Sequence, residues 1–466
     1  MIGVHEPAVR ERGAWVGLSV GLVGLAATLL VLARGGGYFV VVPRLAFVLP
    51  LAVVGGVTAL ASLGVGRRSL NAVVWLGVVA LGGVAWNFLV YSFKFGNGVW
   101  GVLIALAHPT GIDFRDGLYN PALAFSTAHS GWPPLSLLLG RPFTLVSFST
   151  GYVIQVCILV ALAVVATALS AALGVKTVCV PDRSGQGRRV DAPLLALVMG
   201  LWLLTSYGFM YEVERGNIDL YALVFSLLSV WLMIRSRGSA WWPAALLAVA
   251  TGLKLYPAVL LVVLVWRYRW RALAPAVVTT LAALLVAGPG QLQHSLTALN
   301  SLQTNRHAEW WGQDSAAAMA HVLHAHTSWA PSWIVIPLFV VPLVLWVLTM
   351  GGLVRRGWSE RGGVLAAAAC VPMMLIVPTV SNDYKLVLCV FPLAVLAAVV
   401  ATMRREPGAL WAVLFGVLSF AMIFLARSTI VVAPSLQASK YTLLLVVQAL
   451  LLAVVVLARD DAPVSS

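Results

Sequence analysis

Long, uninterrupted apolar runs dominate the hydrophobic pattern of this 466-residue chain. A helix that crosses the roughly 30 Å hydrocarbon core of a bilayer needs about 20 such residues. The pattern therefore predicts an all-α fold, a polytopic bundle of about twelve transmembrane helices. The predicted spans lie near residues 14–34, 45–64, 70–92, 149–174, 192–210, 217–235, 272–290, 332–350, 363–380, 385–402, 408–426 and 441–458.

The composition agrees with a membrane-embedded chain. Hydrophobic residues make up 61% of the sequence and charged residues only 10%, whereas soluble proteins carry about 25% charged residues. This excludes a water-soluble globule, and it also excludes a disordered chain, which would be rich in charge. The four cysteines form neither a CxxC pair nor a cluster with histidine. We therefore expect no zinc site, no disulfide scaffold and no cofactor.

Basic residues gather in short connections on one side of the predicted bundle. If the N-terminus is cytoplasmic, the inner loops hold most of the arginines, as the positive-inside rule expects. The formal net charge of +14 then sets the orientation, and no nucleic-acid partner is expected, because no soluble basic surface exists. In this topology the C-terminus is also cytoplasmic, and two long segments, 93–148 and 291–331, lie outside and contain loop helices.

The apolar stretch 240–265 does not fit a single crossing. Two arginines precede it and three follow it, so one crossing would place one of these clusters outside. Pro257 lacks an N–H and interrupts a helix, and broken backbone is tolerated at membrane depth where it lines a cavity. We therefore predict a broken, re-entrant hairpin whose two half-helices meet at residues 254–257.

Acidic residues and histidines concentrate at the predicted outer ends of the helices. Ionisable groups at membrane depth are costly and are usually paired or functional. Half of the 16 acidic residues lie there, namely Asp113, Asp116, Glu212, Glu214, Asp219, Glu309, Asp314 and Asp383. This distribution predicts a polar chamber at the outer leaflet. His321, His324 and His326 lack a partnered carboxylate, so we expect no metal site.

A carboxylate that shortly follows a transmembrane helix can serve as a general base toward an acceptor hydroxyl. Asp113 and Asp116 have this position in the first long outer segment. The structural alternative is a solvated loop aspartate paired with Arg115.

Four motifs occur in order along the chain. Gly-x-Asp-Phe-x-x-Gly-x-Tyr-x-Pro-Ala-x-Ala-Phe spans 111–125, and Trp-Pro-Pro-Leu follows it at 132–135. Glu-Arg-Gly-Asn-Ile-Asp occupies 214–219. The stretch 248–257 ends in Lys-x-x-Pro, and arginines follow it at positions 267, 269 and 271. Ser-Asn-Asp-Tyr-Lys occupies 381–385. Together these motifs resemble glycosyltransferase family 87, which comprises bacterial mannosyltransferases of the GT-C superfamily that use polyprenyl-phosphate sugars.

The resemblance implies one integral membrane domain over 1–466 with a GT-C-like catalytic core at 65–390. Two additional helices in 14–64 precede this core, and C-terminal helices in 391–466 follow it. The sequence departs from the family at Tyr384-Lys385, where the family carries His-His. Any role of those histidines therefore does not carry over.

The implied reaction is transfer of a sugar, mannose in this family, from a polyprenyl-phosphate donor to a hydroxyl of a glycolipid or glycan acceptor. Transfer would take place with inversion and without a metal ion, on the extracytoplasmic face of a bacterial plasma membrane. The alternatives are an arabinofuranosyl or glucosyl donor and, from another class, a transporter or flippase of lipid-linked sugars. A transporter would usually show two halves with matching broken helices, and only one broken segment is evident.

The resemblance assigns the general base to Asp113, with Asp116 second and Glu212 or Glu214 behind it. For the leaving phosphate the candidates are Lys254, Arg215 and Lys385. Lys254 lies at the predicted break, where an ammonium needs a partner. A snorkelling lysine, or one paired with Asp219 or Asp383, is equally open.

Further side chains of the predicted chamber are candidates for substrate binding. Tryptophan rings can stack on sugars, but they also form interfacial belts in membrane proteins, and Asn217 can simply cap a helix. The candidates are Glu212, Glu214, Asn217, Asp219, Asp383, Trp132, His307 and Trp310.

Overall fold

The computed structural model describes residues 111, 113–123, 132–178, 190, 192–235, 238–304, 315–326, 331–378, 383–402 and 434–457. Every regular element within these residues is a helix, which confirms the predicted all-α fold. The predicted spans 14–34, 45–64, 70–92 and 408–426 lie outside the described residues. The count of about twelve spans therefore stays a prediction.

Two of the described helices are long and apolar enough to cross a membrane. α7 (Phe148–Lys176) has a mean hydropathy of 2.7, and the Ile336–Arg355 part of α16 (Pro331–Arg355) has a mean hydropathy of 2.2. A third candidate, Tyr256–Leu285 with Pro289–Thr297, is bent by 84°. With the composition of the chain, these helices identify a membrane protein.

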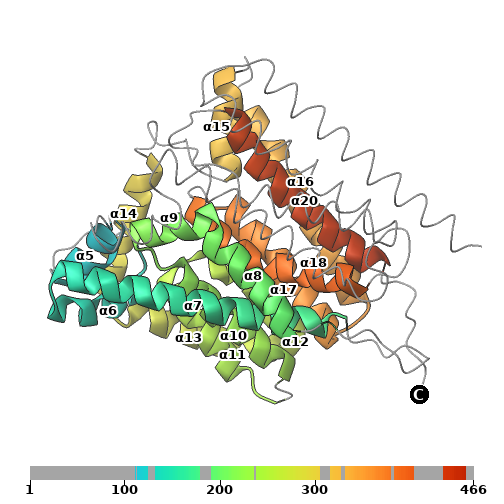
Figure 1. Cartoon of the computed structure of the whole chain (residues 1–466), viewed down its shortest axis with the longest axis horizontal. Helices are drawn as coiled ribbons and strands as arrows, with labels where there is room; N and C mark the ends of the chain where they lie inside the picture. Colours follow the sequence, from blue (N-terminus) through green and yellow to red (C-terminus); the bar gives the residue numbers. More distant parts are fainter. Residues whose placement is uncertain are drawn as a thin grey trace, which may run out of the picture.

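The core of the bundle forms around α7. This helix packs against α8 (Ala192–Thr205), α10 (Asp219–Arg235) and α18 (Val390–Thr402), and Figure 1 shows α7, α8 and α10 running alongside one another. A Cβ added at Gly174 of α7 would lie 2.8 Å from the carbonyl oxygen of Ala394. The absence of a side chain at this glycine lets α7 and α18 approach each other closely.

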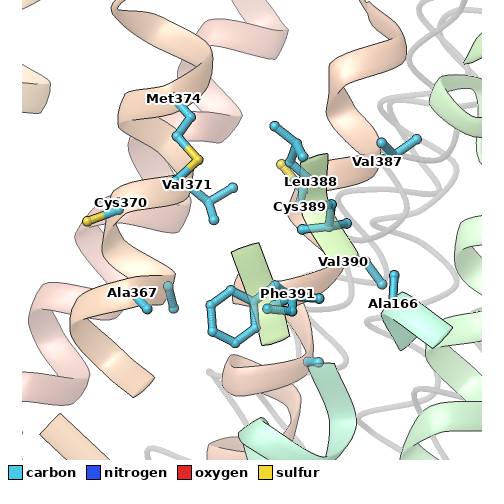
Figure 2. Close-up of a cluster of buried hydrophobic side chains, with 14 of the residues drawn as sticks. Ala166, Ala367, Cys370, Val371, Met374, Val387, Leu388, Cys389, Val390 and Phe391 are labelled. Atoms are coloured by element: carbon cyan, nitrogen blue, oxygen red, sulfur yellow. The ribbon is translucent and has the colours of Figure 1, made fainter. Parts of the chain in front are cut away.

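A second apolar contact joins α17 (Glu360–Ile376) to the segment formed by η6 (Asp383–Cys389) and α18. Ala367, Val371 and Met374 of α17 face Leu388 and Phe391 across this contact (Figure 2), and all five side chains are buried. α20 (Pro434–Leu457) packs on α16 and α17. Apolar burial of this kind contributes roughly 25 cal/mol per Å² in water, and inside a bilayer close packing takes over that role.

One predicted span is wrong in its extent. The sequence predicts a single helix over 192–210, but α8 ends at Thr205 and a separate helix, α9 (Tyr207–Arg215), begins after Ser206. The hydroxyl of Ser206 accepts a hydrogen bond from the N–H of Phe209 at 3.2 Å. This side-chain cap satisfies an N–H of the first turn and starts a new helix inside an apolar run.

The chain breaks and reverses within 240–265. α11 (Trp241–Leu253) ends at Lys254, which is extended with φ −146° and ψ 134°. The 3₁₀ turn η3 (Tyr256–Leu260), α12 (Leu261–Tyr268), the turn η4 (Arg269–Ala272) and α13 (Leu273–Leu285) follow. The break therefore lies where Pro257 predicts it.

Two contacts fix the direction of this segment. Gly252 near the end of α11 lies against Ala283 near the end of α13. Trp241 at the start of α11 and Pro275 at the start of α13 border the same hollow. α11 and α13 are therefore parallel, and η3 with α12 runs back between their ends. Whether this hairpin is re-entrant in a membrane stays a prediction.

The charged groups separate to opposite ends of the described helices. At one end, the ammonium of Lys176 on α7 pairs with Glu360 on α17 at 3.2 Å, and α10 ends at Arg235. The short elements that carry the predicted chamber lie at the other end, with α5 and α6 on the opposite side of Figure 1 from α12. They are η1 (Phe114–Tyr119), α5 (Asn120–Leu123), α6 (Leu135–Gly140) and η2 (Arg141–Leu145).

Two helices lie in the second predicted outer segment. α14 (Pro289–Thr304) follows α13, and α15 (Ala316–His326) packs on α16 and α20. The described part of 291–331 therefore contains helix, as the sequence predicts for this loop.

Candidate active site

Asp113 is held by two side chains from a turn about one hundred residues further along the chain. A guanidinium nitrogen of Arg215 donates to Asp113 Oδ1 at 2.5 Å, and Asn217 Nδ2 donates to Asp113 Oδ2 at 2.7 Å. The Asp113 side chain is 13% exposed and that of Arg215 28% exposed. Each carboxylate oxygen thus has one protein donor and keeps further acceptor capacity.

The turn that carries Arg215 and Asn217 depends on the glycine between them. Gly216 has φ +67° and ψ 36° and ends α9 in the left-handed conformation, which glycine adopts without the steric cost that a Cβ brings. A Cβ at this position would lie 2.5 Å from Cβ of Phe114. The η1 segment therefore packs directly on the turn, and this contact places Asp113 beside Arg215 and Asn217.

Two polar residues of α7 donate hydrogen bonds to the backbone of the turn around Gly216. The Tyr152 hydroxyl donates to the carbonyl of Val213 at 2.7 Å, and Gln155 Nε2 donates to the carbonyl of Asn217 at 3.0 Å. Tyr221 of α10 donates to Gln155 Oε1 at 2.8 Å. Tyr152, Gln155 and Tyr221 were not among the candidates predicted from the sequence. The sequence did contain an indication, since Gln155 is a glutamine inside a long apolar helix, and such a buried side chain needs hydrogen-bond partners.

Asp116 has a different environment. Its carboxylate receives two hydrogen bonds from the Arg115 guanidinium, at 2.8 and 3.0 Å, and both side chains are about half exposed. The hydrogen bond from Arg115 lowers the pKa of the Asp116 carboxyl. The solvated aspartate paired with Arg115 is thus Asp116, whereas Asp113 pairs with Arg215.

Two more carboxylates lie buried behind the turn. Glu212 Oε1 accepts the N–H of Leu220 at 3.0 Å and so satisfies the start of α10. Asp219 Oδ1 accepts the hydroxyl of Tyr256 at 2.7 Å. Glu212 Oε2 and Asp219 Oδ2 have no hydrogen-bond partner within the described residues. Glu214 contributes its backbone carbonyl, which accepts from Tyr152 at 3.2 Å.

Lys254 lies at the break after α11 and is buried. Its ammonium lies 4.0 Å from the centroid of the Trp132 ring, a cation–π contact. Trp132 also packs on Gly117 of η1, where a Cβ would lie 2.8 Å from the indole. The Trp132 ring therefore lies between η1 and Lys254. No ion pair joins Lys254 to Asp219 in the described part of the chain.

Lys385 comes to the same end of the bundle through η6, which packs on α9. Its side chain is buried, and its ammonium lies 5.4 Å from the centroid of the Tyr256 ring. The backbone of Asp383 begins η6. Its side chain, together with His307 and Trp310, lies outside the described part of the structure.

Asn217 has two roles in this arrangement. Its amide oxygen accepts the N–H of Ile218 at 2.7 Å, just before α10 begins, while its amide nitrogen holds Asp113. This bond to the adjacent residue is not a helix cap, since the N–H of Leu220 in the first turn of α10 donates to Glu212.

The candidate site contains an oriented carboxylate, and two buried ammonium groups at the same end of the bundle each lie over an aromatic ring. A carboxylate of this kind can take a proton from a hydroxyl, and ammonium groups can stabilise a phosphate that gains charge. Among the described residues, no group of three or more His, Cys, Asp or Glu side chains has a metal-binding arrangement.

The comparisons with known proteins agree with the sequence resemblance. The family model for glycosyltransferase family 87 matches residues 132–378, more than half of the chain, and includes Trp132, the turn with Arg215 and Asn217, and Lys254. Asp113 precedes the matched residues and Lys385 follows them. No curated protein and no solved structure matches the chain. The chain therefore belongs to glycosyltransferase family 87.

Proposed function

We propose that this glycosyltransferase moves a mannosyl group from a polyprenyl-phosphate donor to a hydroxyl of a glycolipid or glycan acceptor, with Asp113 as general base. The observation that carries the proposal is the double contact of Asp113 with Arg215 and Asn217. It fixes a carboxylate at the end of the bundle where Lys254 and Lys385 also lie. Neither contact uses all of the acceptor capacity of either oxygen.

The donor side of the site suits a lipid phosphate. Lys254 and Lys385 are buried, and each rests on an aromatic ring. Two ammonium groups at one end of the bundle make the electrostatic potential there more positive, which favours an anionic ligand. At the end of α13 that packs against the end of α11, the exposed side chains of Leu285 and Val286 offer a surface for a prenyl chain within the bilayer.

The reaction divides into three linked changes at this site. Asp113 takes the proton of the acceptor hydroxyl, and the acceptor oxygen attacks the anomeric carbon of the sugar. The bond between that carbon and the phosphate oxygen breaks, and its electron pair leaves with the polyprenyl phosphate. Attack opposite to the leaving group inverts the anomeric centre. The charge gained by the phosphate is met by Lys254 and Lys385.

The arginine-rich end of the bundle sets the proposed orientation. Arg235 and the pair Lys176–Glu360 lie at the end opposite to Asp113. The positive-inside rule places that end in the cytoplasm and the Asp113 end outside. The enzyme would then act on the extracytoplasmic face of a bacterial plasma membrane.

The test is transfer of labelled mannose by detergent-solubilised protein with no sealed membrane. We expect the wild-type enzyme to turn over a polyprenyl-phosphate-mannose donor, and Asp113→Asn to lose about 10²–10⁴-fold in rate. Asp116→Asn is the matched control and should keep wild-type activity. Thermal unfolding must be alike in both variants. Near-normal turnover by Asp113→Asn would refute the assigned base.

The same assay separates the other functions. A transporter or flippase would release no glycosylated acceptor in detergent. Donors with arabinofuranosyl or glucosyl groups, offered at the same concentration, identify the sugar. A donor other than mannose that is used at least tenfold faster would replace mannose in the proposal and leave the role of Asp113 intact.

A further inference from the structure

A basic hollow of about 590 Å³ lies at the other end of α11 from Lys254. α11 contains 13 residues, so the hollow is about 20 Å from Lys254 along the helix axis. Its wall consists of the residues before α11 and at its start, the end of α12, η4 and the start of α13. Gly238, Ser239, Ala240, Trp241, Arg267, Tyr268, Arg269, Trp270, Arg271 and Pro275 line it.

The lining of this hollow is strongly basic. Three of the lining residues are arginines and none is acidic. Arg267 packs over the ring of Trp358 at 4.9 Å. Arg269 and Arg271 are exposed, and neither takes part in an ion pair with any described side chain. Guanidinium groups bind phosphate through paired N–H donors.

The backbone at Arg269 brings the arginines to one hollow. Arg269 has φ +56° and ψ −143°, a conformation that a residue with a Cβ rarely adopts. α12 ends at this point and the chain turns toward α13. Arg267 before the turn and Arg271 after it thereby border the same space.

The neighbouring surface is apolar and faces outward. On α13, directly after η4, Leu273, Val277 and Leu281 are each more than half exposed. Trp270 is 73% exposed and Trp241 49% exposed. In a membrane protein, exposed aliphatic side chains face lipid tails, and tryptophan marks the level of the headgroups. The hollow therefore lies where a headgroup would meet a lipid-facing helix.

We propose that this hollow binds the headgroup of an anionic phospholipid, with its phosphate on Arg269 and Arg271 and its acyl chains along α13. A free phosphate or a soluble polyanion would use the guanidinium groups but not the exposed face of α13. Continuity between the basic hollow and that apolar face favours a lipid. Basic pockets between transmembrane helices are known to select anionic headgroups.

The experiment measures lipid binding to delipidated, detergent-solubilised protein by native mass spectrometry with cardiolipin, phosphatidylglycerol and phosphatidylcholine. The variant Arg269→Gln/Arg271→Gln removes two charges at the hollow. The control Arg355→Gln/Arg356→Gln removes two charges from the exposed end of α16. We expect the first variant to weaken binding of the anionic lipids roughly 25-fold, about fivefold for each guanidinium. The control should bind them as the wild type does.

Three results would overturn the proposal. One is an equal loss of binding in both variants, which would show a general charge effect. Another is unchanged binding in Arg269→Gln/Arg271→Gln, or equal binding of phosphatidylcholine. The third is displacement of the bound lipid by millimolar inorganic phosphate, which would make the hollow a site for a small anion. Because Arg269 and Arg271 lie far from Asp113, retained transfer activity verifies that the variant is folded.

Discussion

Asp113 and Arg215 are separated by 102 residues in the sequence and are joined by a 2.5 Å hydrogen bond in the fold. The bond connects the loop before the first described helices to the turn between α9 and α10. A general base must be held within a fraction of an ångström of its productive position, because a misplacement of about 1 Å can lower the rate about 10²-fold. Arg215 is therefore a positioning residue for the proposed base.

Replacing Arg215 by lysine keeps the charge but changes the position and geometry of the donor that holds Asp113 Oδ1. We expect kcat to fall about 10²-fold, with KM for the donor unchanged. Steady-state kinetics with a polyprenyl-phosphate sugar measures both parameters. Arg115→Lys is the control, since the Arg115 side chain donates to the exposed Asp116. If KM for the donor rises while kcat stays at the wild-type value, Arg215 binds phosphate instead.

Gly216→Ala tests the contact between the turn and η1. The new Cβ would lie 2.5 Å from Cβ of Phe114, at a φ of +67°. The left-handed conformation alone costs roughly 1–2 kcal/mol for an L residue. We expect a lower melting temperature and a loss of transfer. Gly351→Ala is the control, because nothing lies within 4 Å of that position. Equal stability of the two variants would contradict the close packing.

The contact between Lys254 and Trp132 predicts a role in binding the donor. Trp132→Ala should raise KM for the donor by about two- to thirtyfold, because a cation–π contact is worth about 0.5–2 kcal/mol. Trp132→Phe retains a ring and should lie between this variant and the wild type. Trp242 is 73% exposed, and Trp242→Ala should leave KM unchanged. An unaltered KM in Trp132→Ala would argue against a donor site at Lys254.

One carboxylate oxygen of Glu212 accepts the N–H of Leu220 at the start of α10, and the other has no hydrogen-bond partner among the described residues. Glu212→Gln keeps the acceptor for the N–H of Leu220 and removes a buried charge, so its stability should equal or exceed that of the wild type. Glu212→Ala leaves that N–H unsatisfied and should lose about 1–3 kcal/mol. Thermal unfolding compares the two variants. A folded but inactive Glu212→Gln enzyme would reveal a chemical role for the carboxylate.

The pH dependence of transfer separates the two loop aspartates. Arg115 lowers the pKa of Asp116, so the stabilising effect of this pair exists above the unfolded pKa and is lost only as the pH falls through the lowered, folded pKa. Because its pKa is lowered, Asp116 stays ionised at neutral pH, and Asp116→Asn should leave the pH–rate profile unchanged. A shift of its acidic limb in that variant would place Asp116 in the reaction.

Much of the fold was predictable from local pattern. The apolar runs of α7 and α16 are long enough to specify helices without further information. The break near Lys254 followed from Pro257 and from the arginines on either side. The division of α8 and α9 was missed, because a serine cap inside an apolar run changes the hydropathy very little. The hydrogen bond that the N–H of Phe209 donates to the Ser206 hydroxyl shows where the new helix begins.

The site was predictable in its members but not in its pairings. The sequence indicated Asp113, Arg215 and Asn217 as separate candidates with separate roles, and the structure brings all three into one contact. Such pairings depend on contacts across about one hundred residues, which periodicity does not encode. Tyr152 and Gln155 were overlooked because two polar residues change the mean hydropathy of the long apolar helix α7 very little. Their function is visible only once the turn above them is known.

The left-handed turn at Gly216 also limits how this enzyme can be recombined with its relatives. Arg215 and Asn217 flank the glycine, and Phe114 rests on it. A chimaera that exchanges only the N-terminal loop would pair a foreign aspartate with a native turn and lose register between them. A chimaera should therefore exchange the loop that carries Asp113 and the turn at residues 215–217 together.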